Sequence, residues 1–406
     1  MSVGALREGA FRQLFLGQAI SALGDRLVPV ALAFAVLGLT GSVTDLGIVF
    51  AAQSIPLVGF VLLGGVWGDR LPRQRVMLAS DGVRAIAQGV SAILLVTGRA
   101  QIWEIAGLQA IYGTAEAFFE PAAASVVPQT VDPSNLQHAN ALLGLSRNLA
   151  AVLGPALAGV LVATIGAGWG LAADAATFVA SAAFLSLMHV TPVVVAARTN
   201  TLTELRAGWR AFRAHNWLWV TVLYFTLFVA FVFSPLEVLG PEVALDWLGG
   251  PGAWAAIGTA LGLGALVGGL VGMRWRPSHP LRVSFISFLT GGPALYGLLA
   301  CHAPLPLILA AALVDGASGT LFTVYWITAI QQEVAPAEQS RVNSWDYLGS
   351  LALQPIGFAI TGPVAAVIGV SSTLYGAGAL FVVLLVGALA VPSVRNFTFR
   401  PRPVGP

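Results

Sequence analysis

The sequence is poor in charge, contains no lysine and has a single cysteine. Only 9% of its 406 residues are charged, whereas an ordinary soluble domain has about a quarter. Cys301 alone can form neither an intrachain disulfide nor a metal site of several cysteines. The five histidines lack the spacing of metal ligands, and there is no phosphate-binding P-loop. We therefore expect no catalytic residue, no metal and no cofactor, and a protein that is not an enzyme.

Long hydrophobic runs take the place of charge. Hydrophobic residues make up 57% of the chain, and its mean hydropathy is +0.83. A helix needs about 20 apolar residues to cross the hydrocarbon core of a membrane, and twelve such runs recur along the chain. The predicted spans are 13–38, 44–66, 76–97, 102–128, 141–165, 170–190, 217–240, 252–273, 281–301, 304–332, 344–367 and 371–392. The sequence thus predicts an all-α membrane protein in a lipid bilayer.

The arginines are distributed unequally between the predicted loops. If the amino terminus is cytoplasmic, sixteen of the twenty lie in inner segments and Arg99 alone lies in an outer loop. The others, Arg26, Arg84 and Arg147, fall within predicted helices. Because positive loops favour the cytoplasmic side, we expect both termini in the cytoplasm and the chain in the cell inner (plasma) membrane. The arginines form no basic domain, so the pI near 9.0 does not indicate nucleic-acid binding.

A hydrophilic segment, 191–216, divides the chain into two predicted six-helix bundles, 1–190 and 217–406. Within it, residues 201–213 place apolar side chains on one face and arginines on the other. This pattern predicts an amphipathic helix at the cytoplasmic membrane surface.

The two halves share a faint repeat. At an offset of 204, Gly64-Gly65 fall on Gly268-Gly269, and at 203 Asn140 falls on Asn343. Parallel repeats of six helices are typical of transporters that bind their substrate between the halves near the middle of the membrane. We expect two pseudo-symmetric bundles and a monomer.

A charged motif follows the second predicted helix: Gly65-Val-Trp-Gly-Asp69-Arg70, then Arg73 and Arg75. A positive inner loop explains the arginines but not the acid beside them. The motif resembles the signature of the major facilitator superfamily, although Pro72 and Gln74 depart from it. The resemblance implies that Gly65, Asp69, Arg70, Arg73 and Arg75 form a conformational latch between the halves.

Further motifs in the first half resemble one branch of that superfamily. They are Asp81-Gly-Val-Arg84, Ala117-Phe-Phe-Glu-Pro-Ala122 and Gly154-Pro155-Ala-Leu-Ala-Gly159. They look like the drug:proton antiporter branch that contains macrolide-efflux proteins and enterobactin exporters. The resemblance implies that Gly154, Pro155 and Gly159 form an antiporter motif associated with export, and ordinary tight helix packing is the alternative.

Several charges lie at predicted membrane depth. Asp25 and Arg26 fall about twelve residues into the first span, where an unpaired charge costs about 2.5 to 3.5 kcal/mol. Glu116 and Glu120 share a helix face with Tyr112, and two carboxylates in a low-dielectric cavity repel, which favours a proton on one of them. We expect Asp25, Glu116, Glu120 and Asp315 as candidate proton-coupling residues.

Structural roles for these charges remain open. Glu116 or Glu120 could pair permanently with Arg84 or Arg147, and neighbouring Ser, Thr and Gly could satisfy Asp315 locally. We expect Arg26, Arg84 and Arg147 to be buried charge partners. The remaining acids lie near predicted helix ends, where gates, caps or interfacial pairs are expected: Asp81, Asp174, Glu237 and Asp346.

Aromatic residues on the first, fourth, seventh and tenth helices are candidates for a substrate cavity, unless they face lipid or pack internally. They are Tyr112, Phe119, Phe225, Phe228, Phe322 and Trp326. An apolar cavity with few acids suits amphiphilic small molecules. The predicted function is proton-coupled export of such molecules, for example drugs, by alternating access. A dedicated siderophore or natural-product exporter is the alternative, and an importer or a non-transport membrane protein is less favoured.

Overall fold

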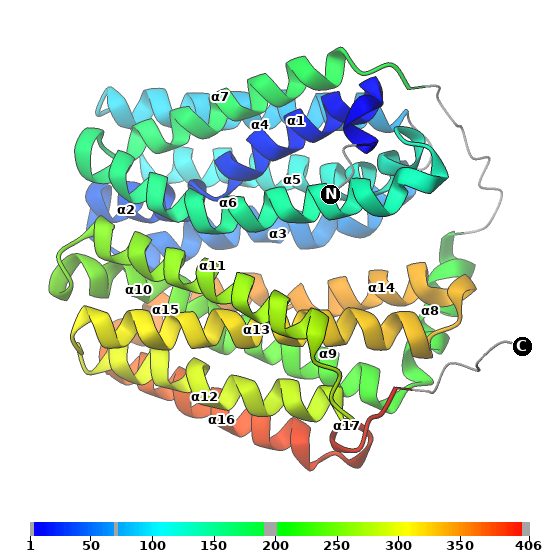
Figure 1. Cartoon of the computed structure of the whole chain (residues 1–406). Helices are drawn as coiled ribbons and strands as arrows, with labels where there is room; N and C mark the ends of the chain where they lie inside the picture. The colour runs from blue at the N-terminus through cyan, green and yellow to red at the C-terminus, as the bar shows by residue number, and fades with distance from the viewer. Residues whose placement is uncertain (1–3, 69–71, 191–200, 400–406) are drawn as a thin grey trace, which may run out of the picture. The chain divides into compact units, whose positions relative to one another are not determined.

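The computed structural model describes residues 4–68, 72–190 and 201–399, and all regular secondary structure in them is helical (Figure 1). The chain forms two compact units. The first comprises Met1–Arg198, Glu237–Thr259 and Phe358–Pro363, and the second comprises Thr199–Leu236, Ala260–Gly357 and Val364–Pro406.

Seven long helices run through the first part of the first unit. They are α1 (Gly9–Asp25), α2 (Val28–Thr40), α3 (Val43–Gly68), α4 (Arg73–Val96), α5 (Ile102–Val126), α6 (Leu136–Ile165) and α7 (Ala167–Ser186). Helix α5 packs against α3 and α4, α7 packs against α4 and α1, and α6 packs against α1. Helix α4 is therefore held between α5 and α7, which brings its polar face into the interior of the unit.

The first predicted span, 13–38, is not one helix: α1 ends at Asp25 and α2 begins at Val28. Pro29 explains the position of the break. A proline at position i has no N–H for the carbonyl of residue i−4, and its ring clashes with that carbonyl; here that residue is Asp25. The sequence thus ends a helix at the acid that it places in the middle of the membrane.

The second unit contains α8 (Thr201–Arg213), α9 (Asn216–Phe228), α12 (Pro280–Ala300), α13 (Leu305–Glu333), α14 (Pro336–Leu351), α16 (Val370–Ala390) and α17 (Pro392–Arg395). Three helices are divided between the units: α10 (Ser234–Trp247), α11 (Pro251–Arg274) and α15 (Gln354–Ile368). The predicted amphipathic helix at 201–213 is present as α8, and Trp209 packs on Trp345 of α14 with ring centroids 5.0 Å apart.

The predicted span 217–240 is also interrupted. A π-helical turn, Val229–Phe233, joins α9 to α10. Pro235 has no N–H to bond the carbonyl oxygen of Phe231, and Ser234 donates both its backbone N–H and its hydroxyl to the carbonyl oxygen of Val229, the hydroxyl at 2.8 Å. Such turns are frequent at functional sites.

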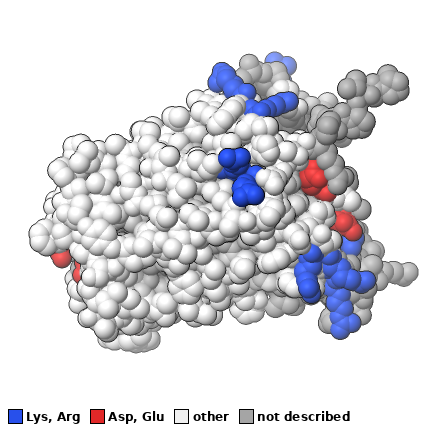
Figure 2. All heavy atoms as spheres, turned by 90° about the horizontal axis from the view of Figure 1, so that it is seen from below, with Lys and Arg blue, Asp and Glu red and all other residues white. Residues whose placement is uncertain are grey.

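Eleven helical segments of the described residues are long and apolar enough to cross a membrane. Helix α5, which carries Glu104, Glu116 and Glu120, is not among them, yet it coincides with the predicted span 102–128. Figure 2 shows a face on which nearly all side chains are uncharged, with a few arginine and acidic side chains among them. The predicted all-α membrane fold is confirmed.

The repeat between the halves has a structural counterpart. A Cβ atom added to Gly113 of α5 would collide with the carbonyl oxygen of Gln53 on α3. A Cβ atom added to Gly316 of α13 would collide in the same way with the carbonyl oxygen of Leu261 on α11. The two glycines are 203 residues apart, which is the offset that aligns Asn140 with Asn343. The offset of 203 therefore relates α5 to α13, whereas the contacted residues Gln53 and Leu261 are 208 apart, so the offset differs from one pair of helices to the next.

Candidate functional site

A polar cluster lies inside the first unit, and its accessible member is Asp25 at the end of α1. Tyr112 of α5 donates its hydroxyl to Asp25 Oδ1 at 3.0 Å. Arg84 of α4 places Nη1 3.7 Å from the same oxygen. The Asp25 side chain is 39% exposed and that of Arg84 is 2% exposed. A buried cation thus lies beside a carboxylate that solvent can reach.

Arg84 is fixed by contacts on several sides. Its Nη2 donates to Oδ1 of Asp81, one turn earlier on α4, and Ser181 of α7 donates to Asp81 Oδ2 at 2.7 Å. The guanidinium lies over the ring of Phe119 at 4.1 Å and over that of Phe178 at 4.2 Å. Asp81 is fully buried. A desolvated cation between two ring faces gains about 2 kcal/mol from each favourable contact, so Arg84 is a fixed charge.

Glu116 lies one turn beyond Tyr112 on α5 and is half-buried. Gln53 of α3 donates its side-chain amide to Glu116 Oε2 at 3.4 Å, which is a long hydrogen bond. Glu120, one turn further, is exposed. No ion pair within 4 Å joins either glutamate to Arg84 or Arg147, all four of which the structure describes. The permanent pairing considered for the two glutamates is therefore absent from this structure.

Asp174 of α7 is fully buried, and neither carboxylate oxygen has a hydrogen-bond partner among the described residues. Gln109 of α5 donates to Gln88 of α4 at 3.2 Å, leaving the Gln88 amide nitrogen and the Gln109 carbonyl oxygen unpartnered within the same described part of the chain. The charges of Asp25 and Arg84 both act on Asp174. The cluster thus extends behind Asp25.

The predicted buried charge partners differ in their surroundings. Arg84 is buried as expected, whereas Arg26 and Arg147 are exposed. Arg26 lies in the short turn between α1 and α2, where Pro29 has no N–H to bond the carbonyl oxygen of Asp25. Burial of all three arginines was expected because they fall inside apolar runs.

The predicted antiporter motif lies against the α1–α2 break. A Cβ atom on Gly154 of α6 would collide with the Cβ atom of Arg26. Pro155 packs beside Gly258, and a Cβ atom on Gly159 would collide with Ala255; both contacts lie within the first unit. Absence of a side chain at Gly154 therefore permits α6 to lie directly against the break.

Part of the predicted latch falls outside the described residues, namely Asp69 and Arg70 in 69–71. Gly65 lies in the last turns of α3, and Arg75 in the first turn of α4. Arg73 donates Nη1 to the carbonyl oxygen of Ser125 at 2.7 Å. Gln74, which departs from the superfamily signature, donates its amide to the carbonyl oxygens of Leu185 and Met188, both at 2.7 Å. It thereby caps the end of α7.

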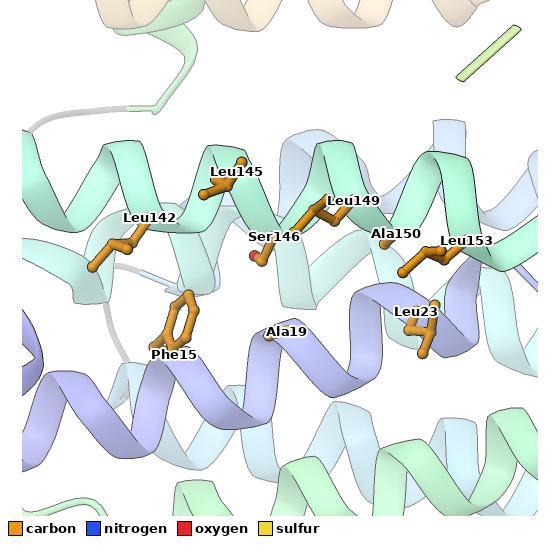
Figure 3. A pocket seen from close by; sticks show the side chains of 9 residues that line it. All are labelled: Phe15, Ala19, Leu23, Leu142, Leu145, Ser146, Leu149, Ala150 and Leu153. Atoms are coloured by element: carbon orange, nitrogen blue, oxygen red, sulfur yellow. The ribbon is translucent and has the colours of Figure 1, made fainter. Parts of the chain in front are cut away.

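An apolar pocket of about 260 Å³ lies between α1 and α6 (Figure 3). Its lining residues are Phe15, Ala19, Leu23, Leu142, Leu145, Ser146, Leu149, Ala150 and Leu153. Ser146 supplies the one hydroxyl and donates it to the carbonyl oxygen of Leu143 at 2.9 Å. The pocket therefore presents almost no free polar group, and its α1 wall ends two residues before Asp25.

The predicted cavity aromatics and Asp315 divide between the units. Tyr112 and Phe119 are buried in the polar cluster of the first unit. In the second unit, Phe322 and Trp326 are buried, whereas Phe225, Phe228 and Asp315 are half-buried. Asp315 Oδ1 has no hydrogen-bond partner among the described residues. Their roles in substrate binding and coupling stay predictions.

The sequence analysis missed Asp81 and Asp174 as cluster members because it placed them near helix ends. Helices α4 and α7 each begin three residues earlier than predicted, so both acids lie deeper. A signal was present in the spacing of polar and aromatic residues at i, i+3 or i+4, and i+7. The set that shares this spacing is Gln18, Ser21 and Asp25 on α1, Asp81, Arg84 and Gln88 on α4, Gln109, Tyr112 and Glu116 on α5, and Asp174, Phe178 and Ser181 on α7.

A family model for the Major Facilitator Superfamily matches residues 14–295. The chain belongs to the major facilitator superfamily. The resemblance inferred from the motif around Asp69 and Arg70 is thereby confirmed. A solved structure of the nucleoside transporter NupG has the same fold, with a TM-score of 0.73 at 14% identity, covering 94% of this chain and 98% of that one.

Three relatives of this superfamily chain match it over nearly its full length. The multidrug efflux pump Tap of Mycolicibacterium fortuitum is 27% identical over 94% of this chain and 95% of its own. The enterobactin exporter EntS of Citrobacter koseri is 30% identical over 97% and 94%, respectively. The macrolide efflux protein A of Streptococcus pyogenes is 23% identical over 96% and 98%. The predicted function class, export of small molecules across a membrane, fits this family and these relatives.

Proposed function

We propose that this protein exports amphiphilic small molecules across the cell inner membrane in exchange for protons. Two six-helix halves, 1–190 and 217–406, joined by the linker 191–216, alternate access to a site near the middle of the membrane, with both termini in the cytoplasm and the protein acting as a monomer. The observation that carries the proposal is the position of Asp25, an accessible carboxylate at a helix break beside a buried, fixed cation.

The coupling proposal follows from the two carboxylates that contact Arg84, those of Asp81 and Asp25. Asp81 is bonded to Arg84 within one helix, whereas Asp25 brings in a different helix, α1. A proton on Asp25 removes its negative charge and weakens both the attraction to Arg84 and the hydrogen bond from Tyr112. Protonation therefore favours conformations in which α1 is released from α4, and loss of the proton favours those in which the two helices are held together.

Glu116 is proposed to assist Asp25, because it lies on the same α5 face as Tyr112 and has a single long hydrogen bond. Glu120 is exposed beyond it and is proposed as an entry point for the proton. In the second unit, Asp315 carries no resident ion pair among the described residues and stays a candidate coupling residue.

The α1–α2 break provides a physical route from protonation to movement. Helix α1 forms one wall of the apolar pocket and ends at Asp25, and Gly154 of α6 lies against Arg26 immediately beyond. A shift of α1 therefore changes the pocket and the α6 contact together. The latch formed by Gly65, Asp69, Arg70, Arg73 and Arg75, and the role of Gly154, Pro155 and Gly159 in favouring export, belong to this proposal.

The substrate is proposed to be amphiphilic. The pocket between α1 and α6 offers apolar side chains to the hydrophobic part of a molecule, and Asp25 offers charge two residues beyond its α1 wall. Ligand pockets of transporters and enzymes combine apolar walls with a few polar groups in this way. The three relatives are named as multidrug, enterobactin and macrolide exporters, which supports export of sizeable organic molecules.

A dedicated siderophore or natural-product exporter is the second candidate. It is favoured by the 30% identity to the enterobactin exporter over 97% of this chain. A panel of unrelated lipophilic dyes separates the two proposals. Accumulation of several dyes supports multidrug export, whereas accumulation of none of them, with gradient-driven transport of a catecholate siderophore, supports the dedicated exporter.

The proposal is tested in everted membrane vesicles with an acid interior. We expect the wild-type protein to accumulate a lipophilic dye in the lumen and to stop when the pH gradient is collapsed. Asp25→Asn and Glu116→Gln are expected to abolish and to reduce this accumulation, respectively. Glu104→Gln is the matched control, because Glu104 lies in the first turn of α5 and a glutamine there preserves the capping box. Wild-type accumulation that ignores the gradient contradicts antiport.

A further inference from the structure

The second unit repeats the framework of the polar cluster but not its cation. The two rings that enclose Arg84 in the first unit form an aromatic cage. At the offset of 203 residues that relates Gly113 to Gly316, both cage rings have aromatic counterparts in the second unit. Phe119 falls on Phe322 and Phe178 falls on Phe381. In the first unit the corresponding rings hold the guanidinium of Arg84.

The charged members change between the units. Tyr112 falls on Asp315. Thr97 at the end of α4 and Cys301 at the end of α12 are 204 residues apart, so Asp81 and Arg84 fall on Phe285 and Phe288. The second unit therefore has an acid where the first has a tyrosine, and it lacks both the arginine and the acid that holds that arginine in place.

Asp315 has no resident partner for its charge. Its Oδ1 atom is buried and has no hydrogen-bond partner, and no charged side chain of the described residues acts on it. It lies beside Phe381: a Cβ atom added to Gly292 would collide with the Phe381 ring and lie 3.0 Å from Asp315 Oδ1. The first unit neutralises Asp25 with Arg84, whereas the second leaves Asp315 without a counter-charge.

A tyrosine lies among the aromatic rings near this acid, on helix α9. Tyr224 of α9 is 4% exposed, and its hydroxyl has no hydrogen-bond partner within the described residues. Its ring packs on those of Phe285 and Phe228, and Phe228 packs on Phe381 beside Asp315. A buried carboxylate without a counter-charge is costly, so the unsatisfied Asp315 indicates that a cationic ligand completes the site. In the first unit the acid lies on α1 and the tyrosine on α5. In the second unit the acid, Asp315, takes the position of Tyr112 on α13, and the tyrosine, Tyr224, lies on α9.

Aromatic rings surround the pair on the accessible side. Phe228 lies 5.8 Å from Tyr224 and 4.8 Å from Phe381, measured between ring centroids, and Phe225 lies 4.8 Å from Phe322. Phe225 and Phe228 are half-buried, as Asp315 is. The interior between the two cage rings is filled by Phe288, 5.8 Å from each, so a ligand is received at the half-exposed side.

We propose that Asp315, Tyr224 and the rings of Phe225 and Phe228 form the subsite for the cationic group of the exported molecule. The ligand class is a lipophilic organic monocation, such as a quaternary ammonium or phosphonium compound. Its charge faces the Asp315 carboxylate, and its apolar substituents contact the faces of the Tyr224, Phe225 and Phe228 rings. The cation that Arg84 provides permanently in the first unit is supplied in the second by the substrate.

This subsite rests on the proposed export function, so its test separates binding from transport. Binding of tetraphenylphosphonium to the purified full-length protein is measured by isothermal titration calorimetry without any gradient. Asp315→Asn is expected to raise the dissociation constant about tenfold or more, because the desolvated cation loses its carboxylate partner while the aromatic rings remain. Asp315→Glu is expected to retain binding within about threefold, because the charge is kept.

Two further variants sharpen the comparison. Phe228→Leu, which removes the ring but keeps an apolar side chain, is expected to weaken tetraphenylphosphonium binding about threefold to tenfold. Asp346→Asn is the matched control: this acid of the same unit already accepts the indole N–H of Trp326 at 3.0 Å, and an asparagine oxygen can accept that hydrogen bond as well. Its dissociation constant is expected to match the wild type, and thermal unfolding verifies that each variant is folded.

The outcomes distinguish the two proposals. Loss of tetraphenylphosphonium binding in Asp315→Asn, with binding retained in Asp315→Glu and in Asp346→Asn, supports the cation subsite whether or not the variant still transports a neutral dye. Equal binding by wild type and Asp315→Asn overturns it, as does the absence of binding by the wild type, even where a neutral dye is exported. Loss of neutral-dye and cation transport together, with binding unchanged, assigns Asp315 to proton coupling and also overturns the subsite. Failure of gradient-driven transport in the wild type rejects the export function alone.

Discussion

The guanidinium of Arg84, which is 2% exposed, lies 3.7 Å from the carboxylate of Asp25, which is 39% exposed. The two residues belong to different helices, α4 and α1, and they meet where Pro29 has ended α1. An acid that is accessible and also paired with a fixed charge has two competing partners, the arginine and a proton. Competition of this kind gives a transporter a way to link proton binding to the position of a helix.

Removal of Arg84 is expected to destabilise the protein severely. Arg84→Leu leaves the buried carboxylate of Asp81 without its cation, and breaking a buried pair costs about 3–5 kcal/mol. The double variant Arg84→Leu with Asp81→Leu is expected to recover much of this loss, because no uncompensated charge remains. The temperature of unfolding in detergent measures both. Arg147→Gln, at an exposed position of α6, is the control, and a loss there equal to that of Arg84→Leu would contradict the account.

Asp174→Asn and Asp81→Asn are expected to differ in their effect on stability. Asp174 has no hydrogen-bond partner among the described residues, so Asp174→Asn replaces one unpartnered buried polar group by another of equal size and is expected to change stability by less than about 1 kcal/mol. Asp81→Asn weakens the bonds to Arg84 and Ser181 and is expected to lower stability by about 2–4 kcal/mol. Chemical denaturation of the purified variants measures the difference, and a larger loss for Asp174→Asn is the contrary result.

Gly154 is expected to tolerate no side chain. Gly154→Val places branched carbon atoms against Arg26 at the α1–α2 break, and overpacking of this kind costs about 1–3 kcal/mol. Dye export is expected to fall more than stability does, because the break beside Asp25 is displaced. Gly144→Val on the same helix is the matched control, since nothing lies within 4 Å of its added Cβ atom. Equal export by the two variants would show that the close approach at Gly154 has no functional role.

Most of the fold could be predicted from hydrophobic runs. Each predicted span corresponds to helix in the structure, because a run of about 20 apolar residues has few alternatives in a membrane. The breaks at Arg26 and at Val229–Phe233 were not predicted, although Pro29 and Pro235 lie where a missing N–H disrupts the helix. Composition identifies a span, whereas its interruptions depend on single residues.

The candidate site was predicted only in part. Asp25, Glu116 and Tyr112 could be selected because charge or polarity at membrane depth is rare. The partner of Asp25 could not be predicted, since it depends on which helices are neighbours: α4 lies between α5 and α7, where Arg84 is buried, whereas Arg147 is exposed on α6. The correspondence of Tyr112 with Asp315 could not be predicted, because it depends on the alignment of α5 with α13, which the close contacts of Gly113 and Gly316 establish.

The most direct test of the account is whether substrate movement drives protons through Asp25. Proteoliposomes containing the purified protein and a luminal pH-sensitive dye are supplied with tetraphenylphosphonium or, in parallel, a neutral lipophilic dye on the outside. The wild-type protein is predicted to make the lumen alkaline as substrate enters and protons leave, and Asp25→Asn is predicted to exchange substrate with no change in luminal pH. A luminal pH change of wild-type size in Asp25→Asn would contradict the account.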